Sequence, residues 1–109
     1  MEFEVSVDRT DSENISVRIK GDVNVHTSPE LKQVMAGFLS GPVKSVQILL
    51  DDVPRMDSSG IATLVEGLQW SRQTGKRFVI SGLTEAVRDL FVLSKLEQEF
   101  DIVESGQKT

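Results

Sequence analysis

The sequence predicts a single α/β domain, because short strand-like segments alternate along it with longer segments of helical periodicity. Its 109 residues fit one domain, and 39% hydrophobic residues are enough for a core that needs no disulfide or structural metal. The chain has no cysteine, which excludes zinc–thiolate sites, disulfides and thiol catalysis. His26 is the single histidine, so a metal site with several histidines is excluded as well.

The charge balance argues against nucleic acid as a partner. Twelve Lys and Arg residues stand against seventeen Asp and Glu residues, which gives a net charge of −5. A chain with this balance does not bind the phosphate backbone of nucleic acids through its overall charge. No apolar run approaches the roughly 20 residues of a membrane span, and the N-terminal residues do not resemble a signal peptide. We therefore expect a soluble cytoplasmic protein.

The first two elements read as strands joined in a hairpin. Apolar and polar residues alternate from Phe3 to Val7 and again from Ile15 to Ile19, with a polar turn between them. Gly21 and Asp22 then end the second strand in a loop that carries Asn24 and His26.

A first helix is predicted immediately after this loop. Thr27 or Ser28 can cap it, and Pro29 suits its first turn. Its apolar residues fall on one stripe: Leu31, Val34, Met35, Phe38 and Leu39. The Ser40–Pro42 segment ends the helix.

The middle of the chain predicts a strand, a helix and a second strand. Residues 46–50 are apolar except for one glutamine, which is typical of a central strand covered on both faces. Helical spacing follows Gly60 and stops at Thr74 and Gly75. Residues 78–80 form the next strand. Trp70 lies off the apolar stripe of its helix and is expected either at the edge of the core or on a partner surface.

The C-terminal part predicts one further helix and a last strand. Thr84 can cap the helix, whose inward side chains are Val87, Leu90 and Phe91. Apolar residues at 93–100 suggest a second short helix, and residues 102–103 a final strand. We expect the domain to span residues 1–104, with a frayed tail at 105–109.

The segment Asp57-Ser58-Ser59-Gly60 lies between the buried strand and its helix. One interpretation is structural, because a serine there can cap the helix. The other is functional, because an exposed serine hydroxyl at a helix N-terminus tolerates a phosphate: the helix dipole offsets its negative charge. On these grounds Ser58 and Ser59 are both candidates for phosphorylation.

Two enzymatic interpretations are disfavoured by the same residues. A serine hydrolase would need His26 within hydrogen-bond reach of Ser58 or Ser59, and the Gly-x-Ser-x-Gly nucleophile motif is absent. A magnesium site would need its carboxylates to converge, whereas Asp51, Asp52 and Asp57 lie in one short stretch. We therefore expect no catalytic residue and no metal.

The chain resembles STAS domains of the bacterial anti-sigma factor antagonist type over nearly its whole length. The resemblance is carried by the order and spacing of several short segments. These are Gly21-Asp22-Val23-Asn24 with Thr27, Val53 with Met56-Asp57-Ser58-Ser59-Gly60, the segment Gly75 to Ile80, and the ending Gly82, Val87-Arg88, Phe91, Leu96 and Phe100.

The resemblance implies a mixed sheet of four to five strands with helices packed mainly on one face. It implies that the chain binds an anti-sigma factor serine kinase, which phosphorylates the serine after the motif aspartate, Ser58 here. A PP2C-type phosphatase removes the phosphate. The chain needs no cofactor, since ATP and magnesium belong to the kinase. The implied partner-binding residues are Asp22, Asn24, His26, Thr27, Asp57, Ser58, Ser59 and Gly60.

Three positions depart from the family pattern. Residues 21–24 stand where the family usually reads Gly-Glu-Leu-Asp, Leu49-Leu50-Asp51 replaces Asp-Leu-Ser, and Arg55 replaces an apolar residue. Arg55 is similar to what is found in STAS subunits of lipid-transport ABC systems. An accessory subunit that docks on an ABC transporter permease or ATPase is therefore the alternative function.

Overall fold

The computed structural model of the protein describes residues 3–104 and has five strands and three helices, which alternate after the first two strands. Antiparallel pairing joins the first two strands, and all other neighbours in the sheet are parallel. The order across the sheet is β1-β2-β3-β4-β5. The elements are β1 (Glu4–Arg9), β2 (Asn14–Lys20), α1 (Ser28–Leu39), β3 (Ser45–Asp52), α2 (Ser58–Gln73), β4 (Arg77–Ser81), α3 (Glu85–Leu93) and β5 (Asp101–Val103).

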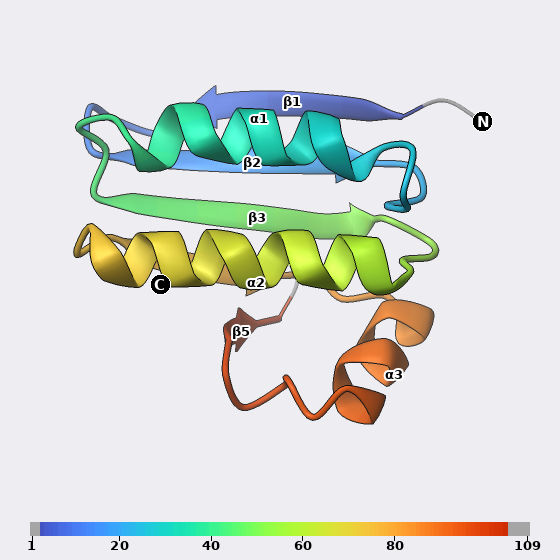
Figure 1. Ribbon diagram of the computed structural model, residues 1–109. Helices are drawn as coiled ribbons and strands as arrows, with labels where there is room; N and C mark the ends of the chain where they lie inside the picture. The colour runs from blue at the N-terminus through green and yellow to red at the C-terminus, as the bar shows by residue number, and fades with distance from the viewer. Residues whose placement is uncertain (1–2, 105–109) are drawn as a thin grey trace.

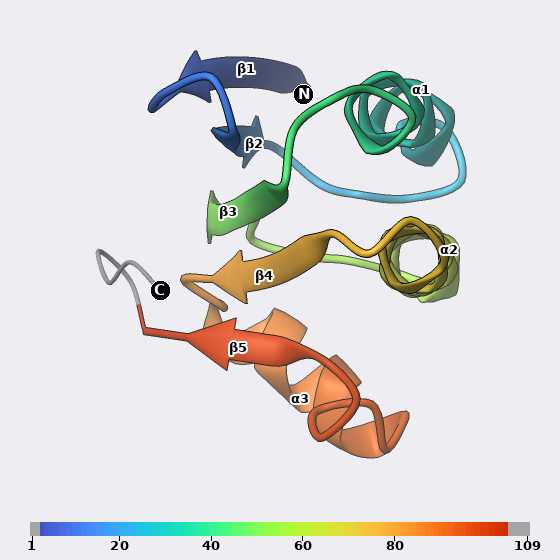
Figure 2. The same ribbon diagram turned by 90° about the vertical axis from the view of Figure 1, so that its left-hand side faces the viewer.

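The helices lie mainly on one side of the sheet, as the resemblance implied. α1 and α2 run side by side, with α1 beside β2 and α2 beside β4 (Figure 1), and the turned view places both on the same face of the sheet (Figure 2). α3 packs at the β4–β5 end, where the Phe91 ring meets Phe100 edge-on with 5.3 Å between the ring centroids. The predicted fold class is confirmed. Within residues 3–104, no helix is long and apolar enough to cross a membrane.

The N-terminal hairpin pairs as its alternation predicts. Val5 faces Ile19 and Val7 faces Val17, all on the helix side of the sheet. In the turn, the Asp11 carboxylate accepts hydrogen bonds from the Asn14 side chain and from the backbone N–H groups of Glu13 and Asn14. These bonds, the one from the Asn14 side chain first, hold the pKa of Asp11 below its ordinary value. β1 forms one edge of the sheet.

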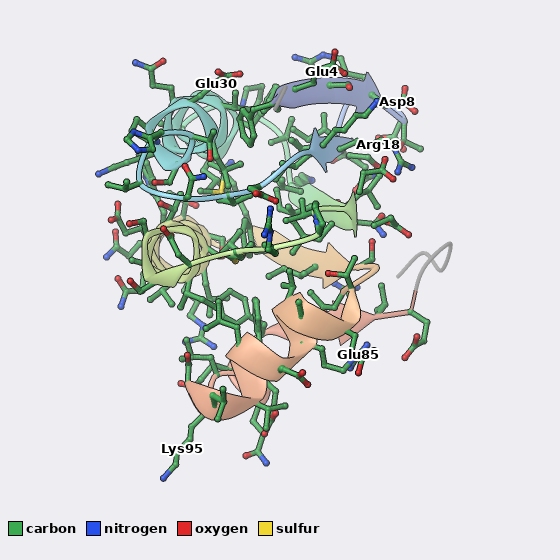
Figure 3. All side chains as sticks on the ribbon, turned by 90° about the vertical axis from the view of Figure 1, so that its right-hand side faces the viewer. Glu4, Asp8, Arg18, Glu30, Glu85 and Lys95 are labelled. Carbon is green, nitrogen blue, oxygen red and sulfur yellow. The ribbon has the colours of Figure 1, made fainter. Side chains whose placement is uncertain are left out.

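The expectation that β3 is covered on both faces is wrong. Its even-numbered side chains from Val46 to Leu50 are buried under the helices, but Gln47 and Leu49 on the other face are only half-buried. No helix among residues 3–104 covers that second face, which carries Glu4, Asp8 and Arg18 (Figure 3). The sequence of the strand nevertheless looks continuously apolar because an apolar residue, Leu49, occupies this open face between the buried Ile48 and Leu50.

The predicted second short helix near the C-terminus is also wrong. α3 ends at Leu93, and Lys95 adopts a left-handed conformation with φ 58°. The Leu96 N–H then donates to the Phe91 carbonyl, which closes the helix end. Leu93 is 80% exposed, so it does not extend the apolar cover; Phe100 returns to the core after a turn. The tail expected at residues 105–109 lies outside the described residues.

Two further predictions, a cap by Thr84 and the position of Trp70, have different outcomes. Thr84 occupies the N-cap position of α3, but its hydroxyl makes no cap hydrogen bond and donates instead to the Val53 carbonyl at 2.8 Å. Trp70 is half-buried and packs against the core. It lies at the core edge, which is the first of its two expected roles.

α1, α2 and β4 approach one another closely, and substitutions of two helix glycines test this packing. A Cβ added at Gly67 on α2 would lie 2.9 Å from Met35 Sδ and 3.0 Å from Phe78 Cζ, whereas one added at Gly37 on α1 would meet nothing within 4 Å. Gly37→Ala should stabilise the domain by about 0.5–1 kcal/mol through helix propensity. Gly67→Ala should lose that gain and destabilise by about 1 kcal/mol through overpacking. Urea unfolding of both variants measures the difference, and equal stabilisation would contradict the packing.

Candidate docking and modification site

Two loops meet at the edge of the sheet where β2 and β3 end. The strands are parallel neighbours, so the loop Asp22–Thr27 and the loop 53–57 leave the sheet on the same side. They are joined by a bridge between Val23 and Met56. The Val23 N–H donates to the Arg55 carbonyl, and the Asp57 N–H donates to the Val23 carbonyl, both at 3.1 Å. The predicted site residues are therefore brought together by the backbone.

The Asp22–Thr27 loop is fixed by its own polar side chains. Asn24 Oδ1 accepts from the N–H groups of His26 and Thr27, at 2.9 and 3.2 Å. Thr27 Oγ1 donates to the Asp22 carbonyl at 2.8 Å and accepts from the Asn24 N–H at 2.9 Å. Asn24 and Thr27 are thus turned inward, where they hold the loop. Of the two predicted caps of α1, Thr27 occupies the N-cap position but its hydroxyl makes no cap hydrogen bond, and Ser28 is the first residue of the helix.

Asp57, and not Ser58, caps α2. The Asp57 Oδ1 atom accepts hydrogen bonds from the N–H groups of Ser59 and Gly60, at 2.9 and 3.2 Å. Ser58 is the first residue of the helix; it is exposed, and its hydroxyl makes no hydrogen bond within residues 3–104. The capping interpretation of the serine is therefore wrong. The aspartate supplies the cap, and the serine hydroxyl is left available for chemistry.

Gly60 is where the motif and the facing loop touch. A Cβ at Gly60 would lie 2.4 Å from Met56 Cγ and 2.9 Å from Val23 Cγ1. A side chain at position 60 would therefore push apart the two loops that the bridge between Val23 and Met56 joins. Gly60 is buried, so it shapes the site and cannot itself contact a partner.

An ion pair that the sequence did not predict ties the two loops at the surface. Arg55 Nη2 lies 3.2 Å from Asp22 Oδ2, with the Asp22 side chain 19% exposed and the Arg55 side chain 70% exposed. The other carboxylate oxygen, Asp22 Oδ1, is buried and has no hydrogen-bond partner within residues 3–104. Arg55 and Asp22 are 33 positions apart, so the sequence gives no sign of this contact unless the two loops are known to meet.

The exposed part of the site is smaller than the predicted set. His26, Asp57 and Ser58 are exposed, Ser59 is half-buried, and Asn24, Thr27 and Gly60 act in the structure of the loops. Val25, which is not among the predicted site residues, is 60% exposed in the loop next to His26. An apolar side chain held outward on a hydrogen-bonded loop suits a protein–protein contact.

The two disfavoured enzymatic interpretations gain nothing from the geometry. Across residues 3–104 no group of three His, Asp or Glu side chains is placed to hold a metal ion. Asp52 is instead ion-paired with Arg18 at 3.4 Å on the open face. Among the described residues, the His26 side chain makes no hydrogen bond to Ser58 or Ser59.

The structure thus combines a mixed five-stranded sheet, helices mainly on one of its faces, and an exposed serine at the start of α2 beside the Asp22–Thr27 loop. The STAS domain family model matches residues 5–108, and the chain belongs to this family.

The chain is similar, in sequence or in fold, to several proteins named anti-sigma factor antagonists. The anti-sigma-B factor antagonist of Staphylococcus aureus (strain NCTC 8325 / PS 47) is 26% identical over 91 residues, 84% of each chain. The anti-sigma-B factor antagonist of Staphylococcus epidermidis is 29% identical over 91 residues, again 84% of each chain. The anti-sigma factor antagonist SpoIIAA, solved unphosphorylated, superimposes with a TM-score of 0.81 at 16% identity, covering 95% of this chain and 90% of that one. The phosphorylated form of Bacillus SpoIIAA gives 0.77 at 15% identity, covering 95% and 93%.

Single substitutions of Asp57 and Ser58 should distinguish the stabilising effect of the capping carboxylate from that of the serine hydroxyl. Asp57→Ala removes an acceptor of two N–H groups and should destabilise the domain by about 1 kcal/mol. Ser58→Ala removes a hydroxyl without a hydrogen bond and should change stability by less than about 0.5 kcal/mol. Asp57→Asn, which keeps an acceptor oxygen, is the control and should recover most of the loss. A larger loss for Ser58→Ala than for Asp57→Ala, measured by urea unfolding, would contradict the assignment of the cap.

Proposed function

We propose that this protein is an anti-sigma factor antagonist that binds an anti-sigma factor serine kinase and is controlled by phosphorylation of Ser58. The single observation that carries the proposal is the state of Ser58: it is exposed, and its hydroxyl makes no hydrogen bond within residues 3–104. A modifying enzyme can therefore reach the oxygen without breaking a structural contact. Membership of the STAS family and similarity to anti-sigma factor antagonists support the same function.

In this function the chain is substrate and binding partner, and it performs no catalysis. Ser58 Oγ accepts the γ-phosphoryl group of ATP held with magnesium by the kinase; ADP leaves, and the hydroxyl proton passes to a base of the kinase. The kinase would contact the exposed residues of both loops, Val25 and His26 on one and Asp57 and Ser58 on the other. A PP2C-type phosphatase would hydrolyse the phosphate and restore binding.

Phosphorylation would weaken binding through charge and not through unfolding. A phosphoserine carries about −1.5 to −2 charges at neutral pH. It would stand beside the Asp57 carboxylate, in the centre of the surface that the kinase covers. Anions that are desolvated together in an interface repel each other strongly, whereas the same charge exposed at the start of a helix is tolerated by the fold.

The alternative function, docking on an ABC transporter permease or ATPase, uses the same surface without modification of Ser58. The exposed Arg55 beside the motif is the observation that favours it. The two functions differ in their partner and in whether phosphate is transferred, so one set of experiments separates them.

Incubation with the kinase encoded nearest to this gene, ATP and magnesium should add one phosphate to the wild-type chain. Mass spectrometry should place it on Ser58, and Ser58→Ala should abolish it while Ser59→Ala does not. Absence of both phosphate and kinase binding would refute the proposed function, and co-purification with a permease would then support the alternative. Phosphate on Ser59 alone would refute the assignment of Ser58.

Ser58→Asp tests the role of charge in the same assay. It should weaken kinase binding at least about tenfold, because like charges placed together in an interface cost several kcal/mol. Its thermal midpoint should remain within a few degrees of the wild type, since an anion is tolerated near a helix N-terminus. Ser58→Asn, similar in size and uncharged, is the control and should bind more tightly than Ser58→Asp. Unfolding of Ser58→Asp would contradict a switch that acts through charge.

A further inference from the structure

A phosphate group on Ser58 would find the nearest backbone donors already in use. The Asp57 carboxylate accepts hydrogen bonds from the N–H groups of Ser59 and Gly60, at 2.9 and 3.2 Å. Phosphate and carboxylate would therefore compete for the same helix end. A cation nearby would stabilise the phosphate further, because the partial charge of the helix N-terminus is only about +0.5.

Arg55 is the basic residue nearest to Ser58 in the sequence. It lies three residues before Ser58 in an extended part of the chain, so the two Cα atoms are at most about 10 Å apart. A long arginine and a phosphoserine directed toward each other can span that separation. Because the Arg55 side chain is 70% exposed, it can turn without disturbing the core.

The bond that Arg55 now makes is a weak competitor. The pair is a single contact of 3.2 Å to Asp22 Oδ2, with the arginine end in solvent. A phosphate offers three strong acceptor oxygens and more charge than a carboxylate, and guanidinium binds it through two parallel hydrogen bonds. We propose that Arg55 is the ligand of the phosphate group on Ser58, and that it leaves Asp22 to bind it. The proposal rests on the phosphorylation of Ser58 in the proposed function.

The exchange would carry the modification to the second loop. Asp22 Oδ1 is buried and makes no hydrogen bond within residues 3–104, so loss of Arg55 leaves a mostly buried carboxylate without a cation. A buried charge without a partner is unfavourable, and the Asp22–Thr27 loop must move to hydrate it. Val25 and His26, at the exposed tip of that loop, would move with it. Phosphorylation would thus alter both halves of the docking surface.

The test uses the full chain with phosphoserine installed at position 58 by genetic encoding, so that no kinase is needed. Two-dimensional ¹H–¹⁵N NMR follows the Arg55 Nε–H signal and the amide signals of residues 24–26. In the wild type, phosphoserine should shift all of these signals. In Arg55→Leu, the loop signals should already be displaced in the unphosphorylated chain, and phosphoserine should move them no further; Arg55→Lys should respond partially.

A matched control is available in another arginine–aspartate pair, which lies far from Ser58 in the sequence. Arg18 and Asp52 are 3.4 Å apart, both about half-exposed, on the open face of the sheet. Arg18→Leu should leave the response to phosphoserine as in the wild type. Loop signals that stay in place when the wild type carries phosphoserine, or that move equally in Arg55→Leu, would overturn the proposal. Because the phosphate is installed without a kinase, this failure is distinct from a failure of the chain to bind or accept phosphate from one.

Discussion

The hydrogen bonds from the start of α2 to the Asp57 carboxylate are the contact on which the rest of the site depends. They set the residue at which the helix begins, and thereby place Ser58 as its first residue with the hydroxyl in solvent. If Ser58 were the cap, its oxygen would be engaged and its modification would remove a structural bond. The division between a capping aspartate and a free serine lets one position be modified while its neighbour maintains the helix.

The second constraint is the parallel pairing of β2 and β3, which brings two loops distant in sequence to one edge. Within these two loops, some residues hold the backbone in place and others are exposed to solvent. Asn24 and Thr27 bond to the backbone of their own loop, and Gly60 permits the loops to touch. Val25 and Ser58 are exposed on this hydrogen-bonded base. A pre-ordered surface of this kind loses little conformational freedom when a partner binds.

Periodicity was sufficient to predict the strands and helices, because most of them bury one face and expose the other. It failed where a decision depended on tertiary contacts. The apolar run of β3 concealed an open face that carries Leu49, the apolar residues after Leu93 are separated from the helix by the left-handed Lys95, and neither Thr27 nor Thr84 caps its helix. The contact of Asp22 with Arg55 joins residues 33 positions apart, so no local pattern could reveal it.

The edge strand β1 has a consequence for how the molecule behaves among its own copies. An edge strand offers unpaired backbone groups to which another sheet can add. If two β1 strands paired antiparallel about Ser6, Glu4 of each copy would lie opposite Asp8 of the other, because both project from the same face of the sheet. Like charges in that position disfavour the pairing. Glu4 and Asp8 thus select against this one register of edge-to-edge pairing between two copies of the sheet.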